Sequence, residues 1–307
     1  MMEQPLRDFK SLIAEARKHG PRKMSVAVAQ EREIIKAIKE GQDLGLVEAV
    51  LVGDGEKVAA LAAEEGLALD PTRVIDEPDW LLATRKAVEL AARGEVDMIM
   101  KGKANTADLI RAVLDRDMGL RTGHLLSGTI VFEVPGFDRL MVLSDASINI
   151  APTLLQKAQM IENAVATARV VGIRQPKVAA LTAFEFINPE MPATVDAANL
   201  TLMARRGQIK GAIVEGPMAL DLALSEVAAE QKGFQSPVTG KADVFLCPDI
   251  EAANIMLRCI IYFAGGKVGG IIQGAKVPIL LISRAEPAET KVNSMALALL
   301  ATQSGEA

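Results

Sequence analysis

Short runs of aliphatic residues alternate along the chain with longer segments in which apolar and polar residues recur at helical spacing. The aliphatic run MSVAVAQ (24–30) precedes the amphipathic segment EREIIKAIKEG, and VEAVLVGDG (47–55) precedes EKVAALAAEEG. In the same way VDMIMKGK (96–103) leads to TADLIRAVLDR. Strand-like runs separated by helices of ten or more residues are typical of parallel, doubly wound sheets. The pattern therefore predicts an α/β fold with mostly parallel strands.

The pattern continues to the end of the chain and predicts about ten strands in all. TIVFEVPG and RLMVLSDA read as two adjacent strands around residues 134–136, and the later strands are KVAALTAF, GAIVEGP, ADVFLCP, VGGIIQG and VPILLIS. Ten strands are too many for one compact mononucleotide fold, so we expect two α/β/α domains. No low-complexity linker is present, and the crossing is expected at 134–136. The expected domains are 1–136 with 284–307, and 137–283, with the last helix, from about Ala288, packing on the first domain.

The composition is that of a globular protein: 50% of the 307 residues are hydrophobic, 24% charged and 3% aromatic. The net charge is −5 and the basic residues are scattered, so we expect no nucleic-acid partner. Cys247 and Cys259 lie in apolar surroundings without a CxxC pair, which suits a reduced, cytosolic protein. The most hydrophobic region, 255–282, is interrupted by charges and glycines, so no membrane partner is expected. The predicted localisation is cytoplasmic.

Candidate chemistry gathers at the expected carboxyl ends of the strands, where ligands of open α/β sheets bind. These ends include MKGKANT (100–106), SDASINIAP (144–152), IIQGAK (271–276) and ISRAEP (282–287). Several of them open directly into helices, whose amino ends favour anions. Together they indicate a site for a phosphorylated ligand. The simpler interpretation of any one loop is that its glycines and aspartates only form the strand-to-helix turn.

The motifs of common cofactor sites and nucleophiles are incomplete. VGDGEKV has Val58 in place of the third glycine of GxGxxG, no complete Walker A loop occurs, and no GxSxG is present. Asp243, Asp249 and Glu251 could hold a magnesium ion, although Asp249 and Glu251 more simply cap a helix beginning near Ile250. We therefore expect no metal, no cofactor and no covalent nucleophile.

Five segments carry a family resemblance: MKGKANTADLIRAVL (100–114), FEVPGFDRLMVLSDASINIAPTL (132–154), ADVFLCPDIEAANI (242–255), GGIIQGAKVPILLISRA (269–285) and the closing AETKVNSMALA. In this order they resemble the phosphate acetyltransferase/phosphate butyryltransferase family. FEVPGFDRL and SRAEPAETK are more similar to the butyryltransferase branch.

The resemblance implies a fold and a reaction. The implied fold has two α/β/α domains of the isocitrate/isopropylmalate dehydrogenase type, with the active site in the cleft between them. The implied reaction is acyl-CoA + phosphate ⇌ acyl phosphate + CoA, without metal or covalent intermediate, so CoA and acyl-CoA are substrates rather than cofactors. A short acyl group such as butyryl or a branched C4–C5 group is expected. The resemblance also implies a homodimer or higher homo-oligomer.

The resemblance assigns catalytic roles near the end of the chain. Arg284 is implied to hold the phosphoryl group, and Ser283 to hydrogen-bond the thioester or the CoA sulfur. The acetyltransferase branch has an aspartate, taken as the base for the CoA thiol, where this chain has Thr290. Glu289 beside it could serve as that base, or could only favour the start of the last helix.

Further positions match the family's ligand contacts. Lys103, Thr106, Ser127 and Asn149 are implied to contact phosphate or CoA, and Gly274 to let the backbone approach the ligand. Three alternatives stay open: a phosphate acetyltransferase, a non-catalytic CoA-sensing module, and an NAD-dependent dehydrogenase of the related fold that uses a divalent metal.

Overall fold

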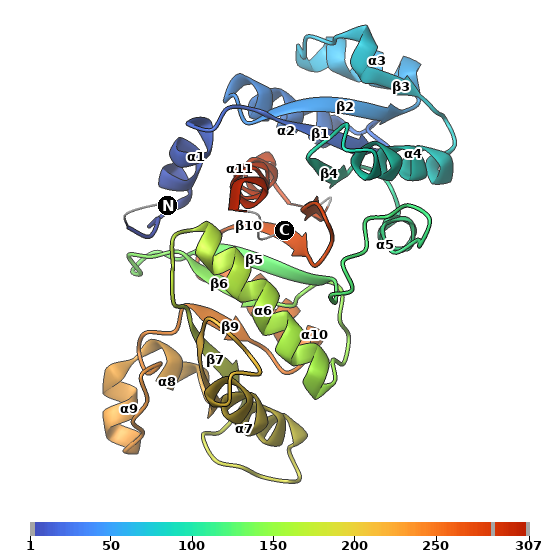
Figure 1. Cartoon of the computed structure of the whole chain (residues 1–307). Coiled ribbons are helices and arrows are strands. Elements are labelled where there is room, and N and C mark those ends of the chain that lie inside the picture. The colour runs from blue at the N-terminus through green and yellow to red at the C-terminus, as the bar shows by residue number, and fades with distance from the viewer. Residues whose placement is uncertain (1–3, 284–285, 305–307) are drawn as a thin grey trace. The chain divides into compact units, whose positions relative to one another are not determined.

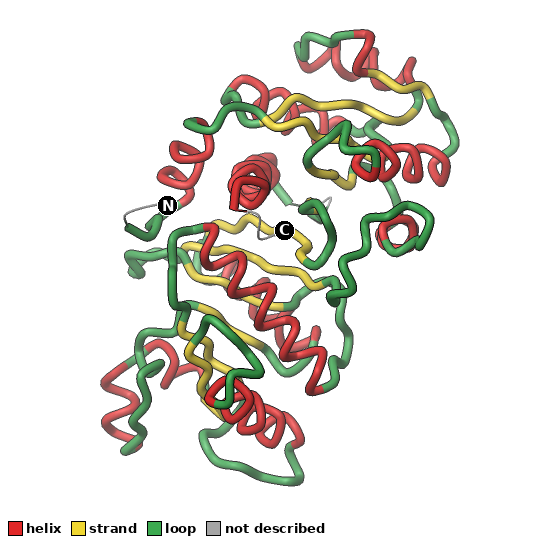
Figure 2. Tube along the Cα trace, in the orientation of Figure 1, coloured by secondary structure: helices red, strands yellow, loops and turns green. Residues whose placement is uncertain are grey.

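The computed structural model describes residues 4–283 and 286–304, which form two compact units. The middle unit contains Leu125–Val268 together with the chain up to Phe9, and the terminal unit contains Lys10–His124 together with the chain from Gly269 onward. Figure 1 shows both units coloured along the chain, and Figure 2 shows how helices and strands alternate along it. No helix among the described residues is long and apolar enough to cross a membrane.

The terminal unit contains a sheet in the order β3-β2-β1-β4-β11-β10, in which only the β10–β11 pair is antiparallel. β4 lies in the middle of this sheet, and all four of its residues are buried. The strands are β1 (Arg22–Ala27), β2 (Val47–Gly53), β3 (Val74–Asp76), β4 (Met98–Lys101), β10 (Lys267–Gln273) and β11 (Ile279–Leu280). The helices are α1 (Phe9–Arg17), α2 (Arg32–Asp43), α3 (Gly55–Glu65), the 3₁₀ helix η1 (Pro71–Arg73), α4 (Trp80–Ala92), α5 (Thr106–Val113) and α11 (Ala288–Ser304).

The last helix, α11, packs closely against α2 and β11. A Cβ atom on Gly41 of α2 would lie 2.5 Å from Sδ of Met295 of α11, so the glycine permits the close approach of the two helices. Residues 292–301 of α11 are all buried. The expected position of this helix, against the part of the chain that precedes residue 136, agrees with this packing.

The middle unit contains a sheet in the order β5-β6-β9-β7-β8. β5 and β6 are antiparallel and the remaining pairs are parallel. Phe245 of β9 is fully buried against Phe132 of β5, with 5.9 Å between the ring centroids. The strands are β5 (Ser127–Glu133), β6 (Met141–Ser144), β7 (Lys177–Leu181), β8 (Ile213–Met218) and β9 (Val244–Leu246). The helices are α6 (Leu154–Val170), α7 (Pro192–Arg205), α8 (Leu220–Leu224), α9 (Glu226–Lys232) and α10 (Ile250–Tyr262).

The α/β class and the mostly parallel pairing confirm the prediction from the hydrophobic pattern. The division of the chain differs from the expected one, because residues 134–136 join β5 to β6 and both strands belong to the middle unit. Their antiparallel pairing, from Thr129 with Ser144 to Phe132 with Met141, holds them together. The chain passes between units at 9/10, 124/125 and 268/269, whereas the expected crossings were at 136/137 and 283/284.

Candidate functional site

Three parallel strands of the terminal unit end side by side at one edge of its sheet. β4 pairs with β1 through Ala27 and Lys101, and with β11 through Met100 and Leu280. Lys103 and Ser283 each lie three residues beyond this Met100–Leu280 pair, so both segments leave the sheet at the same carboxyl edge. The structure thus brings together the KGKANT loop and the segment that contains Ser283. Arg284, which follows Ser283, lies outside the described residues.

The KGKANT loop lies tightly against the end of β1. The backbone N–H of Gly102 donates to the carbonyl of Ala27 (2.9 Å), and that of Lys103 donates to the carbonyl of Val28 (2.8 Å). A Cβ atom at position 102 would lie 2.4 Å from the Val28 oxygen and 2.7 Å from the Ala27 oxygen. Only glycine fits this contact, so the path of the loop depends on Gly102. Val28 itself has a φ of 59°, which is unusual for a β-branched residue.

The two lysines of this loop are placed differently. Lys101 is 7% exposed, and its ammonium donates to the carbonyls of Gly102 (3.2 Å) and Ala104 (3.3 Å), so it braces the loop from inside. Lys103 is half-buried, with its Nζ 5.4 Å from the ring centroid of Trp80, a cation–π distance. Sequence reasoning singled out Lys103 and missed Lys101 and Trp80, since neither burial nor the ring contact is visible in the motif.

Thr106 is the first residue of α5, directly after its cap residue Asn105. The side chain of Asn105 caps this helix by accepting from the N–H of Ala107 (2.9 Å). Thr106 therefore stands at a capped helix start that follows the same strand, β4, as Lys103.

Gly274 lies in the turn between β10 and β11, with a φ of 99° that favours glycine. Its carbonyl accepts from the hydroxyl of Thr122 (2.6 Å), and the nearby Lys276 N–H donates to the carbonyl of Leu120 (3.0 Å). The backbone conformation explains the glycine, while its approach to a ligand stays a prediction.

Glu289 and Thr290, the two residues at the position of the family's aspartate, differ in their exposure to solvent. Ser283 and Glu289 are both exposed, and Glu289 lies in the first turn of α11. Thr290 is buried, and its carbonyl accepts from the hydroxyl of Ser294 (2.8 Å). Glu289 is therefore accessible from solvent, whereas Thr290, which replaces the family's aspartate, is not.

Lys291 is a buried cation that sequence reasoning did not identify. It is 1% exposed, and its ammonium donates to the carbonyl of Glu286 (2.6 Å). Burial lowers the pKa of Lys291, while the carboxylates of Glu33, Glu286 and Glu31 act in the opposite direction. Glu31 and Glu33 lie at the start of α2, which follows β1, so these charges belong to the same edge of the terminal unit.

Asn149 and Ser127 lie in the middle unit and have protein partners. The Asn149 side-chain amide donates to Asp145 (2.6 Å) and to the carbonyl of Leu126 (2.9 Å). Ser127 is fully buried, and its hydroxyl accepts from the Asn163 amide (2.7 Å). These bonds fix the start of β5 and the loop after β6, and the expected contacts with phosphate or CoA stay predictions.

Asp145 organises the loop that follows β6. It is 1% exposed, and besides the Asn149 amide its carboxylate accepts from the N–H groups of Ser147 (2.9 Å), Ile148 (3.2 Å) and Asn149 (3.2 Å). The DASIN sequence contains the signal for this turn, since aspartate side chains accept from N–H groups a few residues onward. Asp145 therefore positions Asn149 from within the protein.

The carboxylates considered for magnesium have structural roles. Asp249 caps α10 by accepting from the N–H of Ala252 (2.8 Å), and the helix begins at Ile250 as expected. Glu251 lies in its first turn, and Asp243 accepts from the N–H of Lys177 (2.9 Å). No group of three or more metal-ligating side chains occurs among residues 4–283 and 286–304.

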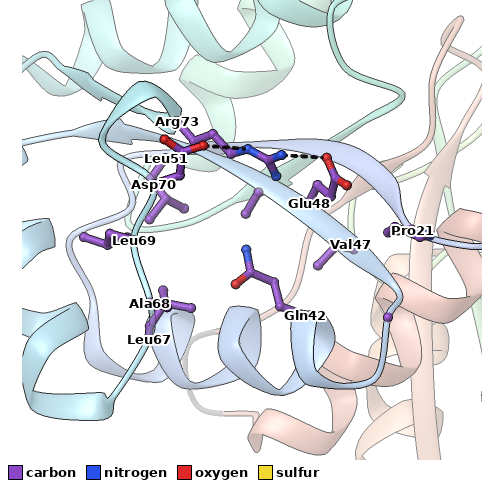
Figure 3. A pocket seen from close by; sticks show the side chains of 12 residues that line it. Pro21, Gln42, Val47, Glu48, Leu51, Leu67, Ala68, Leu69, Asp70 and Arg73 are labelled. Carbon is purple, nitrogen blue, oxygen red and sulfur yellow. Dashed lines mark ion pairs between the residues drawn. The ribbon is translucent and has the colours of Figure 1, made fainter.

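A cavity of about 380 Å³ lies elsewhere in the terminal unit (Figure 3). It is lined by the start of β2 and by the segment 67–73 that precedes β3, and none of the predicted site residues reaches it. The Arg73 guanidinium at this cavity forms ion pairs with Glu48 (2.9 Å) and Asp70 (3.6 Å). Since two carboxylates neutralise it, this arginine does not make the cavity an anion site.

Comparison with known proteins places these features in context. Residues 77–299 match the model of the phosphate acetyl/butaryl transferase family. The chain is 44% identical over 295 residues to a phosphate butyryltransferase of Clostridium acetobutylicum, covering 96% of this chain and 98% of the relative. It is also 44% identical over 289 residues to a phosphate acetyltransferase of Thermotoga maritima, with 94% and 98% coverage.

Solved structures agree in fold. A branched-chain phosphotransacylase from Enterococcus faecalis superposes with a TM-score of 0.81 at 30% identity, covering 92% of this chain and 99% of that one. A putative 4-hydroxythreonine-4-phosphate dehydrogenase from Salmonella typhimurium superposes with a TM-score of 0.56 at 16% identity, with 92% and 99% coverage, which shows a shared fold alone.

Proposed function

The chain belongs to the phosphate acetyl/butaryl transferase family and is a phosphate acyltransferase, and from this premise we propose that it interconverts butyryl-CoA plus phosphate with butyryl phosphate plus CoA. In this reaction a phosphate oxygen attacks the thioester carbonyl carbon. The new C–O bond forms, the C–S bond breaks, and CoA leaves as a thiolate that later takes up a proton. No electrons are transferred, so the reaction needs no redox partner.

The observation that carries the proposal is the parallel pairing of β4 with β11. Because of this pairing, the segments containing Lys103 and Ser283 leave the sheet at the same edge. Phosphate is already an anion at neutral pH, so the protein needs to position it and to neutralise charge rather than to activate a nucleophile of its own. A lysine and a serine at one edge, with an arginine next in sequence, suit that task.

Each residue has a role in this scheme. Arg284 binds two phosphate oxygens through its planar guanidinium, which stays charged at all working pH values. Ser283 donates a hydrogen bond to the thioester oxygen or to the departing sulfur, and Lys103 adds positive charge near the phosphates. In the reverse direction Glu289, exposed at the start of α11, takes the proton of the CoA thiol.

The other residues that match the family's ligand contacts have binding roles in this scheme. In this scheme Thr106, Ser127 and Asn149 contact phosphate or CoA, and Gly274 lets the backbone approach the ligand. The finer architecture of two α/β/α domains of the isocitrate/isopropylmalate dehydrogenase type, with the reaction in the cleft between them, and a homo-oligomeric assembly belong to the same proposal.

The acyl chain is the finer part of the proposal. Overall identity does not decide it, because the butyryltransferase and the acetyltransferase relatives are both 44% identical to the chain. The segments FEVPGFDRL and SRAEPAETK favour a four-carbon substrate through their resemblance to the butyryltransferase branch. Acetyl-CoA is the competing substrate.

A substrate panel tests the proposal. The purified chain is mixed with phosphate and acetyl-, propionyl-, butyryl-, isobutyryl- or isovaleryl-CoA, and CoA release is followed with a thiol-reactive dye. We expect release that depends on phosphate, with the highest kcat/KM for butyryl-CoA. The highest kcat/KM for acetyl-CoA would overturn the four-carbon preference, and release that is the same without phosphate would contradict acyl transfer to phosphate.

A further inference from the structure

The single tryptophan of the chain, Trp80, is the first residue of α4 and is 46% exposed. At 3.6 residues per turn, Ala83 and Ala87 lie on the same side of this helix, and both are buried in a cluster with Val28, the residue after β1. Because the chain reaches α4 from the carboxyl end of β3, Trp80 continues this buried side beyond the ends of the strands. The indole therefore lies at the edge of the sheet from which the KGKANT loop also leaves.

The backbone that carries Trp80 is firmly held. Asp79 caps α4 by accepting from the N–H of Leu82 (2.9 Å), and the hydroxyl of Thr84 donates to the carbonyl of Trp80 (2.6 Å). A tryptophan side chain has only two rotatable bonds, so a ligand that covers it at a fixed helix start removes little conformational freedom. Trp80 is therefore suited to be a binding platform.

A lysine accompanies this ring. The Nζ of Lys103 lies 5.4 Å from the ring centroid of Trp80. Glu77, which precedes α4, forms an ion pair with Lys86 (2.6 Å), so its negative charge is compensated. An aromatic ring beside a lysine suits a nucleotide, because the ring stacks on a planar base while the ammonium attracts the phosphates.

The order of the strands places this pair relative to the reacting group. Trp80, Lys103 and Ser283 all belong to the terminal unit, in which β4 lies between β1 and β11. The KGKANT loop follows β4 and the Ser283 segment follows β11, whereas α4 packs mainly against β1. Along the carboxyl edge the sequence of features is therefore aromatic ring, lysine and serine.

CoA has its chemical groups in the same order: an adenine base, phosphates, and a thiol at the far end of the pantetheine arm. We propose that Trp80 stacks on the adenine base of CoA and acyl-CoA, with the phosphates at Lys103 and the thioester toward Ser283. This inference rests on the proposed function and identifies the part of the terminal unit that holds the nucleotide end of the substrate.

The stack contributes to binding rather than to chemistry. Adenine is unchanged in the reaction and is remote from the bond that breaks, so its contact with Trp80 is equally strong in the bound substrate and in the transition state. Such uniform binding lowers KM and leaves kcat unchanged. Removing one base–aromatic stack weakens binding by about tenfold or more.

The fluorescence of the full chain gives the first test. Because Trp80 is the only tryptophan, the indole emission reports on this position alone. We expect CoA to change the emission in a saturable way and pantetheine, which lacks the nucleotide, to leave it unchanged. CoA binding detected by calorimetry without a change in emission, or an equal change with pantetheine, would overturn the inference.

Kinetics with a truncated substrate give the second test. Trp80→Ala should raise the KM for the best acyl-CoA of the substrate panel by about tenfold, with kcat and the KM for phosphate nearly unchanged. Trp80→Phe should recover part of this loss. With the matching S-acyl pantetheine, which has no base to stack, Trp80→Ala and the wild type should have equal kcat/KM. A similar loss with both acyl donors would show a structural role alone, and an unchanged KM for acyl-CoA would remove the stack.

Leu82→Ala is the matched control. Leu82 is 49% exposed on the same helix, but two residues after Trp80 it lies about 200° round the helix axis. We expect this variant to keep the wild-type KM for acyl-CoA, and a rise equal to that of Trp80→Ala would contradict a specific stack.

The two proposals fail in different ways. The fluorescence titration needs no turnover, so a chain whose emission responds to CoA but that transfers no acyl group to phosphate would contradict the proposed function alone. An active chain in which Trp80→Ala keeps its KM for acyl-CoA would contradict the adenine stack alone.

Discussion

At the scale of single residues, the proposed site depends on one arginine directly after Ser283, which lies three residues beyond the end of β11. Arg284→Ala should lower kcat/KM by about a hundredfold or more, because one charged contact to the developing transition-state charge is lost. Arg284→Lys should recover only part of the activity, since an ammonium cannot reproduce the two-pronged geometry of guanidinium. Initial rates of CoA release, with the urea unfolding midpoint as a check on folding, measure both variants. Nearly unchanged activity in Arg284→Ala would place the phosphate contact elsewhere.

A second residue-scale prediction concerns Gly102. An added Cβ atom would lie 2.4 Å from the Val28 carbonyl oxygen, so the KGKANT loop must shift. Gly102→Ala should therefore reduce the free energy of unfolding by about 1–3 kcal/mol, as overpacking does, and should also lower activity by moving Lys103. Urea denaturation and the CoA-release assay measure the two effects. Unchanged values of both would mean that the loop does not need its close approach to β1.

At the scale of elements, the strands of the middle unit are held together at their starts by Asp243. Its N–H donates to the Lys177 carbonyl, its carbonyl accepts from the Val142 N–H, and its carboxylate accepts from the Lys177 N–H. One residue before β9 therefore bonds to both neighbouring strands, β7 and β6. Burial raises the pKa of the Asp243 carboxyl, although the Lys177 N–H and the charge of Arg139 act against this.

The raised pKa of Asp243 gives a pH-dependent prediction. In a pH window that begins near the ordinary value of 3.8 and extends upward, the folded chain holds a proton that the unfolded chain has released. Stability from this group therefore falls as the pH rises through the folded-state pKa, and its full cost is present at neutral pH. Asp243→Asn keeps an acceptor for Lys177 without a charge. The free energy of unfolding of the variant minus that of the wild type should increase from pH 4 to pH 7, as measured by urea denaturation. An equal difference at both pH values would contradict the prediction.

At the scale of the whole molecule, the chain crosses three times between its two units. Each unit is assembled from segments distant in sequence, so neither corresponds to a continuous half of the chain. The strands β10 and β11 return to the terminal unit after the middle unit is complete, and α11 then covers β11 and α2. The residues proposed to be catalytic therefore follow β11 and precede or begin α11, in the final part of the chain.

Ligand binding should be visible as stability of the whole molecule. CoA at a concentration 100 times its Kd should raise the free energy of unfolding by about 2.7 kcal/mol through mass action. Phosphate should stabilise the wild type by the same rule, and Arg284→Ala should lose the effect of phosphate while keeping that of CoA. Thermal unfolding with each ligand alone measures these shifts. An equal phosphate effect in both chains would show that Arg284 does not hold phosphate.

The sequence by itself determined the α/β class, the positions of most strands and helices, the Asp249 cap of α10 and the family, because these depend on local hydrophobic spacing, on side-chain capping and on contiguous motifs. It could not give the division into units, since the antiparallel pairing of β5 with β6 is a contact that local spacing does not encode. It also gave no sign that Lys101 and Lys291 are buried. Only the tertiary structure set β11 beside β4, and so brought Lys103 and Ser283 to one edge of the terminal unit. The physical reason is that strand order results from the packing of the whole sheet, whereas the pattern of a single strand shows only that it is buried.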